Sequence, residues 1–338
     1  HCKIMNSKIY FLASIVLALS LVSCDNDHGA NVDMPAIKES VISLNAGIAS
    51  MDSTRAMEAD VYTGTSAAGM EAAVWFSREC GVYEYNDAPQ APTFLPYRAN
   101  VKYENGSPTT VYVDPTNKNN PLTYPINDAA GNEVYCVGLY PNSGWECADG
   151  KSVSHAIDGA TDIMFADQIV GSWETPFATQ EYKHLLMWVK VEAEVVDQMA
   201  IHQWGALEDV AIESSNGVSI TFPTSGIANS TIEYAEDKIE INVLGSAASL
   251  PLTSTSQMLG SLLCAPMSKI KLKVKTANIE EKIIEVALND LSGNVITSPA
   301  QTVGKLFIIN LYFNAFHNIE ATCNLVPWNE QNVDLVGK

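Results

Sequence analysis

Hydrophobic and polar residues alternate along most of the chain, which is the period of a β-strand with one buried face. The first such stretch spans residues 42–48, and its apolar positions are Ile42, Leu44, Ala46 and Ile48. Further strand candidates in the first half lie at residues 74–76, 82–85, 101–103, 110–113, 122–126, 134–140 and 163–166. No long stretch shows the 3.6-residue period of an amphipathic helix. The first half therefore predicts a series of short strands.

The second half shows the same period in longer stretches. In residues 183–195 one parity is wholly apolar, while the other changes from apolar to charged along the stretch. Residues 269–275 place lysines on one face and apolar side chains on the other, which predicts a solvated face that also guards against edge-to-edge pairing. Residues 307–313 are almost wholly apolar, and residues 319–325 alternate until Pro327 ends the pattern.

This distribution predicts an all-β protein with two antiparallel β-sandwiches in series. A chain of 338 residues is long enough for two ordinary cores. About seven candidate strands lie on each side of Thr175-Pro176. We therefore place an N-terminal domain at residues 41–175 and a C-terminal domain, with the tail, at residues 176–338.

The first residues have the composition of an export signal. Two lysines precede an uncharged run at residues 9–22, which is shorter than the roughly 20 residues that span a bilayer. The sequence Leu21-Val22-Ser23-Cys24 then resembles the lipobox of bacterial lipoproteins, in which the cysteine is acylated. We predict a signal peptide at residues 1–23 and a tether at residues 24–40 that is lipidated at Cys24. The alternative is an ordinary signal peptide followed by a free thiol.

Charge and motifs exclude several classes of function. Acidic residues outnumber basic ones 39 to 19, a formal net charge of −20, so nucleic acid is not an expected partner. The glycine-rich segment 64–69 lacks the lysine of a phosphate loop, and the chain has no HExxH, GxSxG or GxGxxG motif. The six histidines never stand at metal-ligand spacing. We expect no enzyme activity, no catalytic residue, no cofactor and no metal.

A few single residues remain as candidates. Alternation places His184 on the face of Leu186 and Trp188, which favours packing between domains over catalysis. A calcium loop would need several of the acids at positions 158, 162 and 167, but acidic residues are common throughout this chain. A glycan-binding surface would need aromatic side chains on one exposed face, and the candidates are Trp145, Trp173 and Trp204.

The cysteines do not form a recognisable framework. Five remain after removal of Cys2 and acylation of Cys24, and none forms a CxxC motif. Most are expected to be small buried side chains. A disulfide between Cys136 and Cys147 across a hairpin stays open as an alternative.

The order of several segments resembles the fimbrillin family, the subunits of type V pili. The resemblance runs from Cys24 to the C-terminus, and no single motif decides it. It is carried by the lipobox, Ser53-Thr54-Arg55-Ala56, Tyr135-Cys136-Val137-Gly138-Leu139-Tyr140-Pro141, Tyr182-Lys183-His184-Leu185-Leu186-Met187-Trp188-Val189 and Leu306-Phe307-Ile308-Ile309-Asn310-Leu311. The chain departs from the family at Leu185 and Leu186, where two small residues are usual, and in its loosely matching C-terminal tail.

The resemblance implies two transthyretin-like β-sandwich domains and a precursor exported as a lipoprotein. It also implies that an Arg-specific protease cuts after Arg55, leaves Ala56 as the new N-terminus and so removes the strand that carries Ile42, Leu44, Ala46 and Ile48. A C-terminal strand from another subunit would then fill the groove.

The C-terminal region has two alternative uses. Residues 319–325 either pair within their own domain, or part of the tail leaves to occupy the groove of a neighbour. The resemblance favours the exchange, with the part after Pro327, which carries Trp328, Val333 and Leu335, as the donor.

The sequence thus predicts a structural subunit of a cell-surface fimbrium that supports adhesion. Its expected partners are other fimbrial subunits, the outer membrane through the lipid, and a host or bacterial surface ligand. The alternatives are a lipoprotein that stays anchored and uncut, a surface lipoprotein that binds glycans, and a hydrolase, for which the sequence shows no convergent acid and base.

Overall fold

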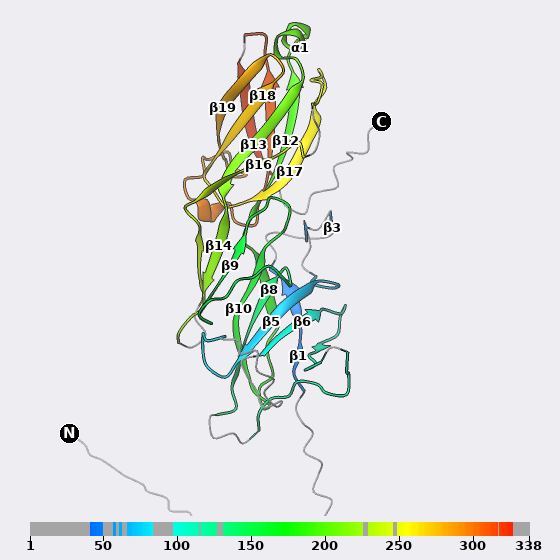
Figure 1. Cartoon of the computed structure of the whole chain (residues 1–338), viewed down its shortest axis with the longest axis vertical. Coiled ribbons are helices and arrows are strands. Elements are labelled where there is room, and N and C mark those ends of the chain that lie inside the picture. The colour runs from blue at the N-terminus through cyan, green and yellow to red at the C-terminus, as the bar shows by residue number, and fades with distance from the viewer. Residues whose placement is uncertain are drawn as a thin grey trace, which may run out of the picture. The chain divides into compact units, whose positions relative to one another are not determined.

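The computed structural model describes residues 41–49, 66–83, 97–114, 116–126, 131–225, 229–245, 249–316 and 318–326, and the backbone of residues 57–58 and 61–62. The prediction of an all-β protein is confirmed (Figure 1). The described part has one α-helix, α1 (Gln198–Trp204), and one 3₁₀ turn, η1 (Pro299–Gln301). No described helix is long and apolar enough to cross a membrane.

The first half, together with residues 180–184 of the second, forms a six-stranded sheet. Its strands, in spatial order, are β2 (Ala46–Ile48), β11 (Gln180–His184), β10 (Met164–Gly171), β8 (Val134–Tyr140), β5 (Glu71–Ser77) and β6 (Tyr97–Lys102). Two small pairs accompany it, namely β1 (Ser43–Leu44) with β7 (Thr109–Thr110) and β3 (Met57–Glu58) with β4 (Val61–Tyr62). Of the other predicted strands in this half, residues 110–113 and 122–126 give only β7 and isolated bridges.

The second half forms two four-stranded sheets and, together with residues 152–156 of the first half, a three-stranded one. The first four-stranded sheet has the order β17 (Gln257–Cys264), β12 (Met187–Val195), β20 (Leu306–Phe313) and β21 (Ile319–Val326). The second has the order β16 (Lys238–Asn242), β13 (Leu207–Ser215), β18 (Lys269–Thr276) and β19 (Ile279–Ala287). The three-stranded sheet is β15 (Thr231–Tyr234), β14 (Gly217–Thr221) and β9 (Ser152–Ala156). Most pairs are antiparallel, but β2–β11 and β12–β20 are parallel.

The six-stranded sheet separates two hydrophobic clusters. Val74 and Phe76 of β5 point into a cluster formed by the first half of the chain, while Trp75 points into a larger cluster shared with the second half. The central strands of this sheet are therefore buried on both faces. By backbone contacts residues 39–338 form one compact unit, and a division into two separate domains stays a prediction.

The prediction of one strand over residues 183–195 is wrong. The chain leaves the six-stranded sheet after His184 and enters another sheet at Met187. Between them the backbone N–H of Leu185 donates to the carbonyl of Ile163, and the carbonyl of Leu186 accepts from the N–H of Gly304. Because β11 belongs to the six-stranded sheet, the chain leaves that sheet after His184, and the predicted domain boundary at residues 175 and 176 stays a prediction.

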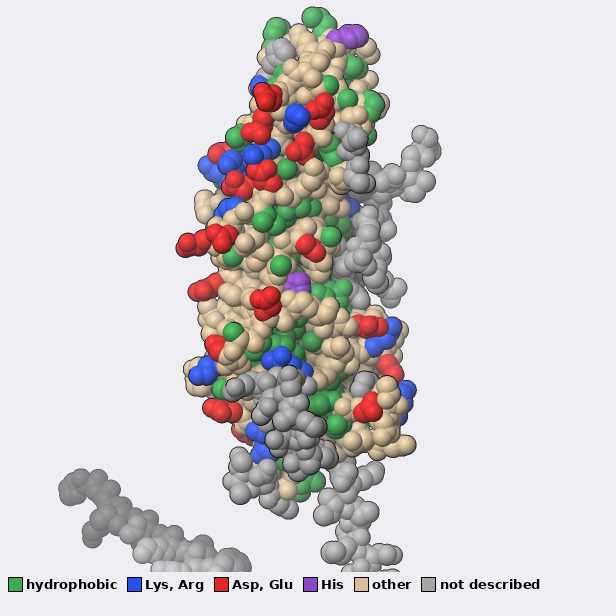
Figure 2. Space-filling model, in the orientation of Figure 1, with side chains coloured by type: hydrophobic (Ala, Val, Ile, Leu, Met, Phe, Trp, Pro, Cys, Tyr) green, Lys and Arg blue, Asp and Glu red, His purple; other side chains and the backbone are tan. Residues whose placement is uncertain are grey.

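Of the two roles predicted for the lysine face of β18, solvation fits the structure and protection of a sheet edge is wrong. β18 lies inside its sheet, so its lysines do not protect an edge. They pair with glutamates of the same sheet: Lys271 with Glu213 of β13 at 3.0 Å, Lys275 with Glu208 of β13 at 2.9 Å, and Lys273 with Glu240 of β16, one strand further away. Figure 2 shows this mixture of charges on the surface. Exposed pairs of this kind contribute about 0–1 kcal/mol each, so the face mainly supplies solubility.

Candidate functional site: the groove of the N-terminal strand segment

Residues 41–49, called here the N-terminal strand segment, run along two different sheets. β1 pairs antiparallel with β7, so that Ser43 lies opposite Thr110. β2 pairs parallel with β11, and the N–H of Ala49 donates to the carbonyl of Tyr182 over 2.7 Å. The segment is thus held by pairing with parts of the chain far away in sequence, and its strands are too short to persist alone.

The side chains of this segment alternate as predicted. Ile42 and Leu44 are fully buried, Ile48 is buried, and Ala46 packs partly buried against the same cluster. Ser43 points the other way, with its Oγ 3.4 Å from Oγ1 of Thr110. Burying the three large side chains contributes roughly 5 to 9 kcal/mol, on a scale of about 1.5 to 3 kcal/mol each. Loss of the segment would leave an apolar slot in the cluster.

The segment also covers a sheet edge. β2 is the outermost strand of the six-stranded sheet, and β11 is its inner neighbour. Without β2, the outward backbone groups of Gln180 and Tyr182 would have no partner in this sheet. Such an edge, combined with an apolar slot, is a template for another extended chain.

A buried polar network holds two side chains of β11, Gln180 and Tyr182. The Tyr103 hydroxyl donates to Oε1 of Gln180 over 2.7 Å and lies 3.0 Å from the Tyr182 hydroxyl. Nε2 of Gln180 donates to Sγ of Cys136 over 3.3 Å. Burial raises the pKa of Tyr103 and of Tyr182, so both stay neutral hydroxyls. None of these bonds involves the N-terminal strand segment, so the network would still hold β11 if the segment were removed.

Gly138 of β8 leaves room for the Tyr182 hydroxyl of this network. Replacing Gly138 provides a first prediction. A Cβ at position 138 would lie 2.2 Å from the hydroxyl oxygen of Tyr182, a side chain that is fully buried. We expect Gly138→Ala to destabilise the fold by about 1 to 3 kcal/mol through overpacking, measured by chemical unfolding. Adding Tyr182→Phe removes the nearest clashing atom and leaves the ring Cζ, 2.5 Å from the added Cβ, so the double variant should lose somewhat less than the two single changes together. Additive losses would contradict this packing.

Several predicted site residues lie outside the described part. These are Cys24, Arg55, Ala56, Trp328, Val333 and Leu335. β21 pairs with β20 along its whole length, from Ile319 opposite Phe313 to Val326 opposite Leu306. Residues 319–325 thus pair within their own half of the chain. An exchange by the part after Pro327 stays a prediction.

The other candidate residues have structural partners. His184 is buried, with Nδ1 2.8 Å from Oδ2 of Asp162. Asp158 accepts hydrogen bonds from its own turn, at the N–H groups of Ala160 and Thr161. The three acids of the considered calcium loop thus have different surroundings, and no described group of three His, Cys, Asp or Glu residues is arranged to hold a metal. His184 thus has a buried carboxylate partner, and the absence of a catalytic role stays a prediction.

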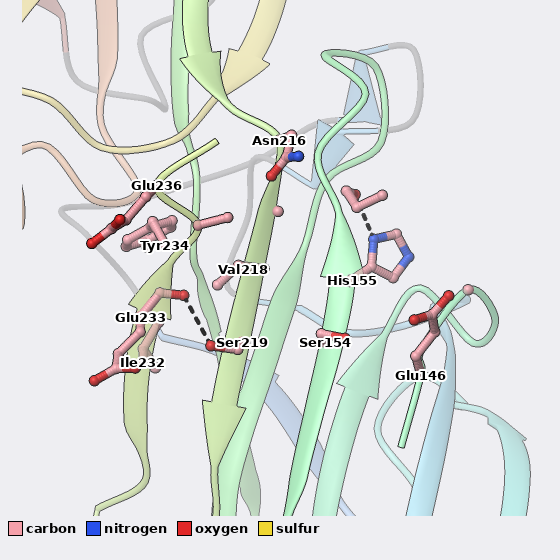
Figure 3. A pocket seen from close by; sticks show the side chains of 14 residues that line it. Glu146, Ser154, His155, Asn216, Val218, Ser219, Ile232, Glu233, Tyr234 and Glu236 are labelled. Carbon is pink, nitrogen blue, oxygen red and sulfur yellow. Dashed lines mark hydrogen bonds between the residues drawn. The ribbon is translucent and has the colours of Figure 1, made fainter. Parts of the chain in front are cut away.

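The tryptophans do not form a shared platform. Trp204 is fully buried, Trp173 is 40% exposed, and Trp145 is half-buried with its indole N–H donating to the carbonyl of Pro141. A shallow hollow lies instead on the three-stranded sheet (Figure 3). Across this sheet Ser154, Ser219 and Glu233 stand in one row. Its described lining offers hydroxyl and carboxylate groups but no tryptophan face.

The predicted alternative of a disulfide is wrong. Cys136 and Cys147 are free, as are the other three cysteines of the described part. Cys136 is fully buried, and burial raises its pKa. Sequence reasoning also missed the contact between Tyr103 and Gln180. Tyr103 was predicted only as part of a strand, and Gln180 lay outside every predicted strand. Its position two residues before Tyr182 was the only local signal that both side chains share a face.

Comparison with known proteins gives only distant likenesses. No family model matches the chain, and no curated protein matches it. Among solved structures, a candidate cell adhesion protein from Bacteroides uniformis is 12% identical, with 86% of this chain and 99% of that one covered and a TM-score of 0.47. A candidate cell adhesion protein from Bacteroides ovatus is 15% identical, with 85% of this chain and 97% of that one covered and a TM-score of 0.46. A fimbrial protein from Bacteroides vulgatus is 11% identical, with 85% of this chain and 99% of that one covered and a TM-score of 0.42. Because these TM-scores lie below 0.5, the likeness does not establish a shared fold or function.

Proposed function

We propose that the chain is a non-enzymatic structural subunit of a cell-surface fimbrium, assembled by strand exchange. One observation carries the proposal. The N-terminal strand segment fills a buried slot with Ile42, Leu44 and Ile48 and covers a sheet edge, yet it lies between the export region and the rest of the fold. Cleavage after Arg55 would separate this one segment from the strands that hold it.

An exchanged strand would replace both sets of interactions. A peptide from a neighbour can pair with β7 and β11 and place its own apolar side chains in the slot. Each such contact joins two different surfaces of the chain, so it does not close and a filament grows. The product is a polymer at the cell surface that supports adhesion to a host or bacterial ligand.

The tail has a pattern that fits this slot. Val333, Leu335 and Gly337 are spaced by two residues, as large, large and small. The segment that they would replace has Ile42, Leu44 and Ala46 in the same order. In this register the donor runs in the same direction as the strand that leaves, antiparallel to β7 and parallel to β11.

The second candidate is a lipoprotein that stays uncut and binds surface glycans. The hollow on the three-stranded sheet would be its site, since hydroxyls and carboxylates suit sugar hydroxyl groups. Surface tryptophans that would stack on a sugar ring are missing from its described lining. The two candidates differ in one measurable property, because only the fimbrial subunit is released from its lipid by a cut after Arg55.

Both candidates share a membrane anchor at Cys24, which gives a second prediction. Cys24→Ala should abolish incorporation of labelled palmitate and leave the signal peptide uncut by the lipoprotein signal peptidase. Cys2→Ala is the matched control, since it removes the other cysteine of the first 24 residues and should leave labelling unchanged. Palmitate in the Cys24→Ala chain would show that the lipidation site lies elsewhere.

A further inference from the structure

The dipeptide Asn-Gly occurs twice in the chain, at residues 105–106 and 216–217. In this dipeptide the backbone nitrogen of glycine can attack the side-chain amide of the preceding asparagine, because glycine has no Cβ to obstruct the approach. The attack requires a backbone that bends the two groups together. The reactivity of each copy therefore depends on how firmly the fold holds its backbone.

The first copy, Asn105 and Gly106, lies in an exposed loop between β6 and β7. The N–H of Glu104 closes this loop by donating to Oγ1 of Thr109 over 3.0 Å. Within the described part, no hydrogen bond holds the side chain of Asn105 or the N–H of Gly106. Gly106 has a φ of +71°, and beyond the adjacent residues no atom lies within 4 Å of the place where a Cβ would stand. This copy is thus free to bend.

The second copy is held by backbone pairing on both sides. Gly217 is the first residue of β14, and its carbonyl accepts from the N–H of Ala235 over 2.9 Å. The carbonyl of Asn216 accepts from the N–H of Ile157 over 2.9 Å, and its own N–H donates to the carbonyl of Asp237 over 3.1 Å. The side chain of Asn216 lines the shallow hollow (Figure 3), so the backbone, and not burial of the amide, restrains this copy.

We infer that Asn105 is a site of spontaneous deamidation in the folded chain. The nitrogen of Gly106 forms a bond to Cγ of Asn105, the bond from Cγ to Nδ2 breaks, and ammonia leaves with the proton of the Gly106 N–H. The product is a cyclic succinimide, which one water molecule then opens. Breaking the new bond to Cγ gives aspartate, and breaking the original backbone bond gives isoaspartate. This inference does not depend on the proposed function.

The change is confined to the loop, because both of its ends are fixed. Tyr103 is buried, and its carbonyl accepts from the N–H of Gly69 over 2.8 Å. Thr109 of β7 pairs with Leu44 of the N-terminal strand segment. Either product adds a negative charge beside Glu104, and isoaspartate also lengthens the main chain by one carbon. The modified loop thus leads directly into one wall of the groove.

Mass spectrometry of the full chain, incubated at mildly alkaline pH, tests the inference. Deamidation replaces NH₂ by OH, and fragment spectra assign the change in mass to position 105 or 216. In the folded chain Asn105 should react at least about tenfold faster than Asn216, because Asn216 reacts only when its strand opens. In concentrated urea neither copy is held, so the two rates should converge.

The variant Asn105→Gln is the matched control, since it keeps an uncharged amide whose longer side chain would have to close a larger ring. On isoelectric focusing, the incubated parent chain should gain a more acidic band that Asn105→Gln does not gain. An Asn105 that stays intact in the folded chain while both copies react in urea would overturn the inference. Equal rates at positions 105 and 216 in the folded chain would show that the fold does not select between them. An equally strong acidic band from Asn105→Gln would place the modification elsewhere.

Discussion

A chain that lacks residues 329–338 should fold and be lipidated, but stay monomeric after cleavage at Arg55. β21 ends at Val326 and pairs along its length with β20, so the deletion leaves the described strands complete. It removes Val333 and Leu335, whose burial in a neighbour's slot contributes roughly 3 to 6 kcal/mol. That loss weakens the contact by more than about 100-fold. Filament formation is read by electron microscopy and by the ladder of oligomers on a gel.

Single substitutions in the tail test which of its side chains enter the slot without changing the length of the tail. Leu335→Asp should block polymerisation as strongly as the deletion, because position 335 faces the slot in the proposed register. Val336→Asp is the matched control, since position 336 has the opposite parity and should face away. Filaments from the truncated chain would place the donor elsewhere. A truncated chain that fails to fold would assign the tail to its own sandwich.

Replacing Arg55 should give the second large effect, a precursor that is never matured. The chain has three arginines, and the other two are engaged in the described part. Arg98 lies 3.6 Å above the ring of Trp75 and donates to the carbonyl of Tyr83, while Arg78 donates to the carbonyl of Gly131. An Arg-specific protease at limiting concentration should therefore cut first after Arg55.

The charge-conserving variant Arg55→Lys should resist this protease, stay full-length and form no filaments. Sequencing of the new N-terminus measures the outcome directly, and the expected terminus of the parent chain is Ala56. A first cut after Arg78 or Arg98 would contradict the maturation step. Filaments built from uncut Arg55→Lys would show that assembly does not need cleavage.

The sequence predicted best those strands that have one buried face. The apolar parity of residues 42–48 was correct because solvent or polar neighbours lie on the other side of this segment. β5 was predicted only at residues 74–76, although it spans Glu71–Ser77, because both its faces are buried and alternation is lost. The change of sheets at Leu185 and Leu186 was invisible for the same reason, since both residues are apolar and buried.

The groove itself was outside the reach of local pattern. Its walls come from β7 and β11, which lie about 65 and 135 residues beyond the segment that they bind. Gln180 fits no hydrophobic alternation, yet it is fully buried because Tyr103 and Cys136 satisfy its amide. Long-range pairing and buried polar contacts of this kind become visible only in the folded chain.

A reversible lock on the N-terminal strand segment tests strand exchange most directly. The side-chain oxygens of Ser43 and Thr110 lie 3.4 Å apart, so Ser43→Cys with Thr110→Cys places two thiols within reach of a disulfide. The single variant Ser43→Cys and the parent chain control for the native cysteines. After cleavage at Arg55, the oxidised double variant should form no filaments, because the segment cannot leave, and a reductant should restore them to the level of the controls. Filaments of equal yield from the oxidised, fully cross-linked chain would contradict the account.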